Sequence, residues 1–209
     1  MGRDFVYVIL GGGVAAGYAA LEFTKKGVSN GELCIISDEL VAPYERPALS
    51  KGFLLPQAPA RLPGFHTCVG ANEERLCWND GPGLLFSIKY TSGIELILGT
   101  RVISADTRRK RLLTATGETI SYKFLIIATG ARVLKLEEIG INGSNAENVC
   151  YLRDLADATK LVNIMRMYTG GHAIVIGGGY IGMECAASLV MNKINVTMVF
   201  PGSYCSKHF

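Results

Sequence analysis

The chain has 209 residues, 49% of them hydrophobic and 19% charged, so it is long and apolar enough to bury a globular core. Its net charge of +3 is too small to indicate nucleic-acid binding. The apolar runs are shorter than the roughly 18–20 residues of a membrane-spanning helix. Strand pattern begins at Phe5, so we also expect no N-terminal leader. The six cysteines show no CxxC or metal-ligand spacing, so no metal site is predicted.

The N-terminal segment predicts a strand, a helix and a second strand. Phe5–Leu10 is a short apolar run typical of a buried parallel strand, Val14–Lys26 has helical pattern, and Glu32–Ser37 is the next strand. The turn between the first strand and the helix has the spacing GxGxxA and consists of Gly11, Gly12, Gly13, Val14, Ala15 and Ala16. Such a turn lets the backbone approach a pyrophosphate, to which the helix N-terminus offers free N–H groups. Asp38 and Glu39 follow the second strand, where an acid meets a ribose hydroxyl.

The middle of the chain predicts a functional loop and then short strands. Residues 41–61 are rich in proline and have no hydrophobic period. We interpret them as an ordered loop leading to a short helix, because loops of this length are seldom idle in a compact domain. Four later segments have strand character, the last of them buried: Ile94–Leu98, Val102–Ala105, Arg111–Thr114 and Phe124–Ala128.

A second glycine-rich turn lies further along the chain. Tyr151–Tyr168 has helical pattern, and His172–Ile176, Tyr180–Met191 and Asn195–Phe200 predict a strand, a helix and a strand. The turn before the second helix has the spacing GxGxxG and consists of Gly177, Gly178, Gly179, Tyr180, Ile181 and Gly182. Two such turns predict two dinucleotides, so electron transfer between a flavin and a nicotinamide is the leading hypothesis. A full nucleotide domain needs several strands, whereas the second one here supplies only two, so we expect the second nucleotide domain to be incomplete.

Several further motifs are shared with one known family. They are Ala42–Lys51, Ala60–Gly70, Leu125–Gly130, Tyr151–Asp154 and Thr197–Pro201. With the two glycine-rich turns, they resemble the FAD-dependent pyridine-nucleotide oxidoreductases of the glutathione-reductase class, and within it the plant monodehydroascorbate reductases. The resemblance implies an α/β, doubly wound FAD/NAD(P)-binding fold, with an FAD-binding domain over residues 1–150 and the start of a NAD-binding domain over residues 151–209. It spans the N-terminal half or less of a usual family member.

The resemblance also implies roles for individual residues. Gly11–Ala16 would hold the pyrophosphate of FAD, and Gly177–Gly182 that of NAD. Lys51 would lie beside flavin N5 and Glu184 would pair with it, so these two are the candidate catalytic residues. The other candidate FAD ligands are Glu39 at the adenosine ribose, Arg46 at the pyrophosphate, and Thr129, Gly130 and Arg153 along the cleft.

The activity implied by the family is hydride transfer from NADH to FAD, followed by single-electron transfer to the monodehydroascorbate radical, which regenerates ascorbate. The substrate is then a small molecule. Two alternatives stay open: a flavoprotein of the same fold that reduces a ferredoxin or rubredoxin, and a non-catalytic FAD-binding stub. The stub is considered because the family's later Gly-Asp motif and C-terminal interface domain have no counterpart here. We expect a cytoplasmic location, with a peroxisomal parent as the alternative, and the oligomeric state is left open.

The sequence departs from the family pattern at two further places. Residues 78–92 do not match it, which we interpret as a spliced or mispredicted exon. After Phe200-Pro201 the chain has Gly202, where the family commonly has an acid, and residues 202–209 no longer resemble the family. An acid at that strand end would bind a ribose of the nicotinamide nucleotide, and no arginine replaces it to hold a 2′-phosphate. A preference for NADH over NADPH is therefore implied by the family alone.

Overall fold

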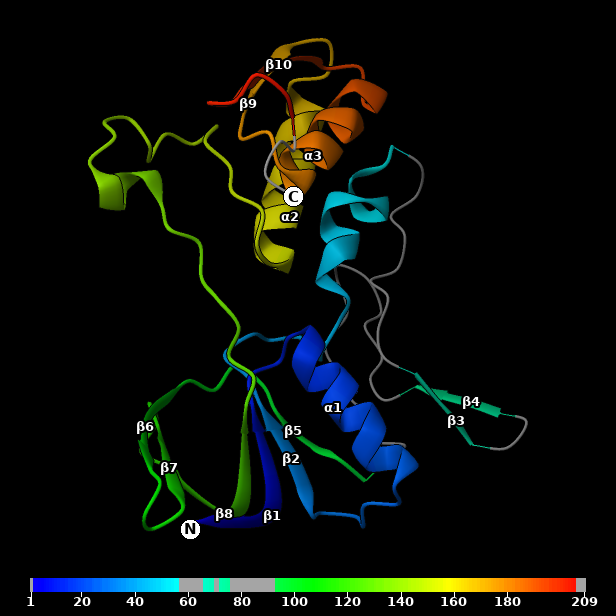
Figure 1. The fold of residues 1–209 in the computed structure, drawn as a ribbon, viewed down its shortest axis with the longest axis vertical. Helices are drawn as coiled ribbons and strands as arrows, with labels where there is room; N and C mark the ends of the chain where they lie inside the picture. Colours follow the sequence, from blue (N-terminus) through cyan, green and yellow to red (C-terminus); the bar gives the residue numbers. More distant parts are fainter. Residues whose placement is uncertain (1, 57–65, 70–71, 76–92, 206–209) are drawn as a thin grey trace. The chain divides into compact units, whose positions relative to one another are not determined.

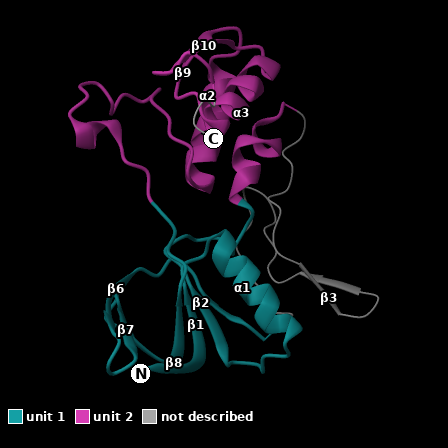
Figure 2. Cartoon of the chain, in the orientation of Figure 1, with its two compact units in different colours: residues 1–45, 63–131 teal, residues 46–62, 132–209 magenta. Residues whose placement is uncertain are grey.

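The structure is a computed structural model that describes residues 2–56, 66–69, 72–75 and 93–205 (Figure 1). The chain forms two compact units (Figure 2). Unit 1 comprises Met1–Glu45 and Pro63–Ala131, and unit 2 comprises Arg46–Leu62 and Arg132–Phe209. The predicted domains, 1–150 and 151–209, are defined by the nucleotide that each binds, and they stay a prediction. The two units divide the chain differently, because Arg46–Leu62 belongs to the second unit. The off-family segment 78–92 and residues 206–209 lie outside the described residues.

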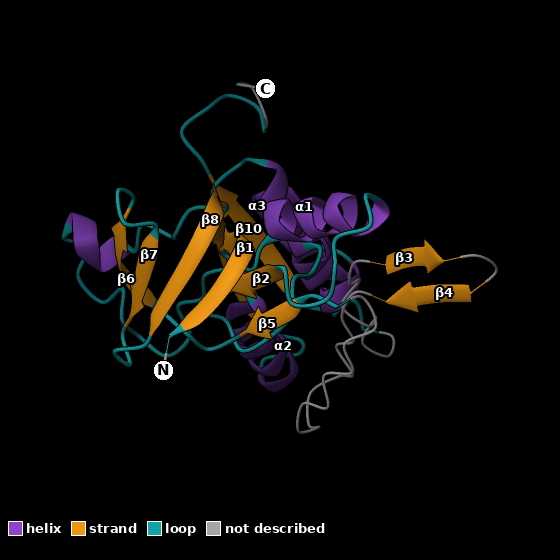
Figure 3. Cartoon of the chain, turned by 90° about the horizontal axis from the view of Figure 1, so that it is seen from below, coloured by secondary structure: helices purple, strands orange, loops and turns teal. Residues whose placement is uncertain are grey.

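Unit 1 is built on a six-stranded sheet with the strand order β5-β2-β1-β8-β7-β6 (Figure 3). Its strands are β1 (Arg3–Leu10), β2 (Leu33–Ile36), β5 (Glu95–Ile97), β6 (Val102–Asp106), β7 (Arg111–Thr114) and β8 (Thr119–Ile127). The first four in this order are parallel, whereas β7 and β6 are antiparallel. Helix α1 (Val14–Lys25) joins β1 to β2 in the predicted βαβ unit. A separate antiparallel pair consists of β3 (His66–Val69) and β4 (Asn72–Arg75).

Two apolar clusters cover the two faces of this sheet. Beneath α1, Ile9, Leu33 and Ile35 of the sheet pack against Ala16 and Ala20 of the helix. Successive strand residues point to opposite faces, and the second cluster includes Val8, Cys34, Ile36, Leu112 and Ile120. All four residues of β2 are buried, as expected of a parallel strand covered on both faces. The small side chains of α1 let it approach the sheet closely, which fixes its N-terminus at the end of β1.

Strand β8 differs from its prediction in length and in burial. The sequence predicts a buried strand over Phe124–Ala128, whereas β8 starts at Thr119 and pairs with β1 along most of its length. The prediction of burial is wrong for Phe124 and Ile127, which are 59% and 71% exposed. An apolar run predicts a strand covered on both faces. Here the ring of Tyr7 in β1 stacks on that of Phe124 with 5.5 Å between centroids, and Lys110 Nζ lies 6.0 Å from the Phe124 centroid, which still leaves most of the Phe124 side chain exposed. β7 pairs with β8 only as far as Ser121.

Unit 2 contains a parallel pair of strands and two α-helices. These are α2 (Leu155–Met167), β9 (His172–Ile176), α3 (Tyr180–Met191) and β10 (Asn195–Val199), together with the short 3-10 helices η1 (Arg46–Ser50), η2 (Gly52–Leu54) and η3 (Leu136–Ile139). Asp154 caps α2 by accepting the backbone N–H of Asp157 at 2.9 Å. Leu54 of η2 joins Met165, Cys185 and Leu189 in the core of this unit. The proline-rich segment is therefore anchored on the helices of unit 2.

Candidate functional site

The first glycine-rich turn lies where three strands of unit 1 end together. Gly11 has a φ of +118°, and its N–H donates to the carbonyl of Ile36 at 2.8 Å. A Cβ on Gly11 would lie 2.2 Å from the carbonyl oxygen of Ala128, so β1, β2 and β8 converge here. The N-cap of α1, Gly13, makes no side-chain capping bond. Gly13 therefore places no side chain over the first turn of α1, and a helix N-terminus of this kind is the arrangement that binds a phosphate.

Glu39 is held beside this turn by two groups of unit 1. Its backbone N–H donates to Ser37 Oγ at 3.1 Å, and its Oε2 accepts the hydroxyl of Tyr44 at 3.0 Å. The ring of Tyr44 is fully buried, whereas Glu39 is only half-buried. Thr129 and Gly130 follow β8 at the same edge of the sheet, because Ala128 N–H donates to Leu10 O at 2.8 Å. The predicted site residues of unit 1 thus lie together at one edge.

The second glycine-rich turn in unit 2 has the same local geometry. Gly177 has a φ of +121°, and its N–H donates to Val199 O at 2.8 Å. Gly179 is the N-cap of α3 and makes no side-chain capping bond. A Cβ on Gly182 would lie 2.2 Å from Gly177 O, so the close approach of helix and strand requires a glycine. This turn, too, can receive a pyrophosphate.

Lys51 and Glu184 meet directly in unit 2. Lys51 Nζ lies 3.0 Å from Glu184 Oε1 and 3.1 Å from Oε2, and it also donates to Pro47 O at 3.3 Å. Ser50 Oγ donates to Glu184 Oε2 at 2.5 Å. The lysine side chain is 55% exposed, whereas that of Glu184 is 30% exposed. The carboxylate therefore holds an accessible ammonium group in place, and the catalytic roles of both residues stay predictions.

Two polar residues of α3 that the sequence analysis missed strengthen this arrangement. Ser188 Oγ donates to Ser50 O at 3.4 Å, and Asn192, which follows the helix, donates through Nδ2 to Leu54 O at 2.8 Å. With Glu184 they recur at intervals of four residues, so they share one face of α3. A polar row at that spacing in an otherwise apolar helix is the sequence signal that could have identified them.

The remaining predicted residues of unit 2 lie at the start of α2. Arg46 Nη1 donates to the carbonyl of Arg153 at 3.2 Å, and Arg153 N–H donates to Asp157 Oδ2 at 2.8 Å. Both arginines are half-buried. The predicted residues thus form one set in unit 1 and another in unit 2, and each set is described within its own unit.

Glu184 gives unit 2 a pH dependence with a defined sign. The hydrogen bond from Ser50, and then that from Lys51, lowers the pKa of Glu184 from its ordinary value. Its contribution to stability is present above the unfolded glutamate pKa of about 4.3 and is lost as pH falls through the lower folded pKa. We expect Glu184→Gln to be less stable than the wild type near neutral pH, and the difference to shrink in acid. Urea unfolding across this pH range measures it.

Glu22→Gln is the matched control for this prediction. Its carboxylate also has a lowered pKa, but it pairs with Lys25 at 2.6 Å on the exposed surface of α1. Exposed ion pairs contribute little to stability, so this variant should follow the wild type closely. A constant difference between Glu184→Gln and wild type at all pH values would contradict the assignment.

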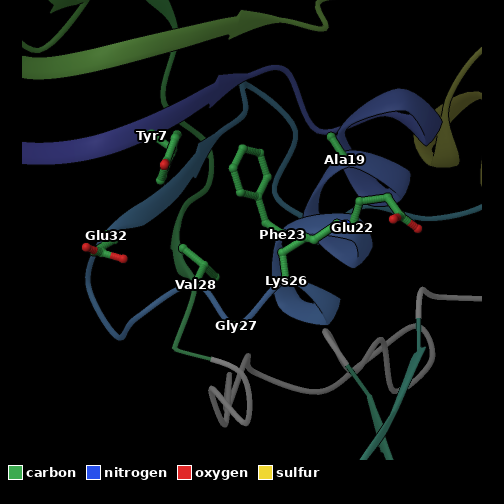
Figure 4. Close-up of a pocket in the computed structure, with 8 residues that line it drawn as sticks. All are labelled: Tyr7, Ala19, Glu22, Phe23, Lys26, Gly27, Val28 and Glu32. Carbon is green, nitrogen blue, oxygen red and sulfur yellow. The ribbon is translucent and has the colours of Figure 1, made fainter.

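One cavity of unit 1 lies away from the glycine-rich turn. It has a volume of about 410 Å³ and is bordered by the C-terminal half of α1 (Figure 4). The rings of Tyr7 and Phe23 lie 4.7 Å apart between centroids and are tilted by 46°. The full lining is Tyr7, Ala19, Glu22, Phe23, Lys26, Gly27, Val28 and Glu32. None of these is a predicted nucleotide ligand, so this cavity is distinct from the predicted FAD site.

Comparison with known proteins assigns the class. Residues 5–206 match the family model described as pyridine nucleotide-disulphide oxidoreductase, and the chain belongs to this family. A solved structure of the putidaredoxin reductase–putidaredoxin complex aligns with 98% of this chain and 44% of its own, at a TM-score of 0.73 and 26% identity. A ferredoxin reductase from Rhodopseudomonas palustris aligns at a TM-score of 0.69 and 30% identity, over 94% of this chain and 42% of its own. The predicted α/β fold and the predicted cofactors, FAD and NAD, are those of this family.

The narrower resemblance is also confirmed. Monodehydroascorbate reductase 4, peroxisomal, from Arabidopsis thaliana is 73% identical over 98% of this chain and 40% of its own length. Monodehydroascorbate reductase 4, cytosolic, from Oryza sativa subsp. japonica is 54% identical over 97% of this chain and 45% of its own. The chain thus spans less than half the length of these relatives. Within the described residues, no helix is both long and apolar enough to cross a membrane.

Proposed function

We propose that this chain carries the FAD- and NADH-binding elements of a monodehydroascorbate reductase. The observation that carries the proposal is the pair of matching glycine-rich turns, each with a strongly positive φ at its first glycine and a glycine at the N-cap of the helix that follows. The relatives at 73% and 54% identity support monodehydroascorbate as the electron acceptor. The substrate is then a small-molecule radical.

The residues of each unit fit the group assigned to them. Gly11–Ala16 hold the FAD pyrophosphate against the first turn of α1, and Glu39 accepts the adenosine ribose hydroxyls. Gly177–Gly182 do the same for the pyrophosphate of NADH. The other residues assigned to FAD are Arg46, Thr129, Gly130 and Arg153. Bound FAD supplies the redox chemistry, because it accepts a hydride and releases electrons one at a time.

Lys51 supplies a fixed positive charge near the reacting part of the flavin. Its ammonium group is held by Glu184 at 3.0 Å and by Pro47 O at 3.3 Å, so it does not have to reorganise when negative charge develops. Glu184 orients it and is itself held by Ser50. These contacts all lie within unit 2 and are formed by the chain alone.

The visible spectrum of the purified chain tests the proposal. We expect the chain to bind FAD, and the flavin absorbance to bleach when NADH is added in the absence of oxygen. Monodehydroascorbate radical generated enzymatically should then oxidise the flavin again. A chain that stays colourless after incubation with FAD would overturn it and favour the non-catalytic stub. Bound FAD that NADH fails to bleach would limit the function to FAD binding.

A second candidate function is reduction of an iron–sulfur protein. The observation that favours it is the structural match to the ferredoxin reductase at 30% identity and a TM-score of 0.69. Such a partner needs complementary surface charge, so its reduction should weaken as salt is added. Reduction of ferredoxin by the FAD-loaded chain, at a rate above that of the ascorbate radical, would make it the preferred function.

Tyr44→Phe is expected to weaken FAD binding without unfolding unit 1. The change removes the hydroxyl that donates to Glu39 at 3.0 Å and keeps the buried ring. A hydrogen bond to a carboxylate contributes about 1.5–3 kcal/mol, so the loss should not exceed roughly 100-fold in Kd. Quenching of flavin fluorescence during titration measures it.

Tyr18→Phe is the control for Tyr44→Phe, because Tyr18 donates to Glu45 at 2.8 Å on the exposed face of α1. It removes a hydroxyl–carboxylate bond of similar length that does not involve Glu39. Equal FAD affinity of the two variants would show that Tyr44 does not position Glu39.

The cellular location is proposed from the relatives. Those at 73%, 70% and 66% identity are named peroxisomal, and one at 54% is named cytosolic. We favour the peroxisomal association for the full-length protein over the cytoplasmic location expected from the N-terminus. A fluorescent fusion of the full-length protein, imaged beside a peroxisomal marker, distinguishes the two.

A further inference from the structure

The two βαβ units repeat each other closely enough to compare them residue by residue. In unit 1 the N–H of Gly11 donates to Ile36 O at 2.8 Å, and in unit 2 the N–H of Gly177 donates to Val199 O at 2.8 Å. Each acceptor is the last residue of the second strand of its unit. Ile36 and Val199 are therefore equivalent positions.

A second contact confirms this register. A Cβ on Gly12 would lie 2.4 Å from Ser37 Oγ, and a Cβ on Gly178 would lie 2.9 Å from Phe200 Cγ. In both units the middle glycine is thus covered by the residue that follows the second strand. Counting two residues further from this contact makes Gly202 the counterpart of Glu39.

The two sites therefore differ at the position that reads the ribose. Glu39 presents a carboxylate, held by Tyr44, to a ribose beside the first turn. A carboxylate there accepts hydrogen bonds from the 2′-hydroxyl and repels a 2′-phosphate. Gly202 has no side chain, and no Asp or Glu occurs anywhere from residue 185 to residue 209. The residues that follow β10 therefore supply no carboxylate to favour the hydroxyl over the phosphate.

We propose that the second glycine-rich turn does not discriminate between NADH and NADPH, and that Gly202 is the position responsible. This inference rests on the proposed function, in which that turn binds a nicotinamide dinucleotide. The pyrophosphate contacts are common to both nucleotides, so binding relies on the turn and on the N-terminus of α3. The chain then accepts either nucleotide, with affinities that differ less than about tenfold.

Binding of NADH and of NADPH to the FAD-saturated chain tests the inference. Saturating FAD occupies the first turn, and reducing it beforehand with dithionite in the absence of oxygen prevents hydride transfer, so that titration calorimetry reports binding at the second turn. We expect dissociation constants within about tenfold of each other. NADH binding more than about 100-fold tighter than NADPH would overturn the inference and leave the proposed function intact. If neither nucleotide binds, the assignment of the second turn is wrong and the inference falls with it.

A pair of variants at one position separates charge from size. Gly202→Glu restores the acid, and its Cβ would lie 3.3 Å from Tyr204 O, which a small shift accommodates. It should shift the ratio of affinities toward NADH by about tenfold or more. Gly202→Gln has the same length without the charge and should leave NADPH binding near the wild-type value. An unchanged ratio in Gly202→Glu would overturn the equivalence of Gly202 with Glu39.

Discussion

Gly11→Ala should destabilise unit 1 by about 3–5 kcal/mol, because it combines backbone strain with a collision. Gly11 has a φ of +118°, which costs an alanine about 1–3 kcal/mol. The new Cβ would also lie 2.2 Å from the backbone oxygen of Ala128 and 2.6 Å from its carbonyl carbon. Main-chain atoms of a paired strand cannot move aside as a flexible side chain can. The ends of β1 and β8 would have to separate, and the first nucleotide site would be lost with them.

Gly177→Ala is the matched control, because its φ of +121° is close to the +118° of Gly11 but a Cβ there meets nothing within 4 Å. It should cost only the backbone strain. Buried Cys34 reports on unit 1 and buried Cys185 on unit 2. Thiol labelling at increasing urea, read for each cysteine by mass spectrometry, therefore measures each unit separately. Equal destabilisation by the two changes would show that Ala128 does not crowd Gly11.

The sequence predicts the glycine-rich turns and their neighbouring elements well, and for physical reasons. The bounds found for β9 and α3 are those predicted, and α1 ends one residue earlier than expected. Short apolar runs followed by GxGxx(G/A) leave few alternatives, since the first glycine requires a positive φ and the third a close helix–strand contact. Local chemistry thus determines these elements before tertiary packing does.

Contacts between distant segments could not be read in the same way. Ser188 and Asn192 look like ordinary polar residues of a helix until η1 and η2 lie against them, more than a hundred residues earlier in the chain. Likewise, Ile174 and Ile176 are apolar residues of a strand that the sequence predicts, yet they are 68% and 72% exposed. Hydrophobic pattern indicates that a strand forms, but the cover on each face depends on the segments that pack against it.

Lys51→Met should slow reduction of the flavin by NADH about 100-fold, the scale on which a preorganised charge acts at a reacting centre. Methionine keeps much of the length and apolar surface of the side chain but removes the ammonium group that Glu184 holds at 3.0 Å. Without this cation the reduced flavin is less stable, so the midpoint potential should also fall, by roughly 30 mV for each tenfold loss of reduced-state stability. Stopped-flow absorbance and a redox titration measure the two effects independently.

The companion variant Glu184→Gln tests how much of this effect depends on orientation. It keeps the Lys51 charge and loses the carboxylate that both Lys51 and Ser50 contact, so a smaller loss is expected, of about tenfold. Lys25→Met is the control, because Lys25 forms an ion pair at 2.6 Å with Glu22 on the surface of α1 in unit 1. If NADH reduces the flavin of Lys51→Met as fast as that of the Lys25→Met control, Lys51 does not act at the redox site. The pair with Glu184 would then serve only to fasten η1 to α3.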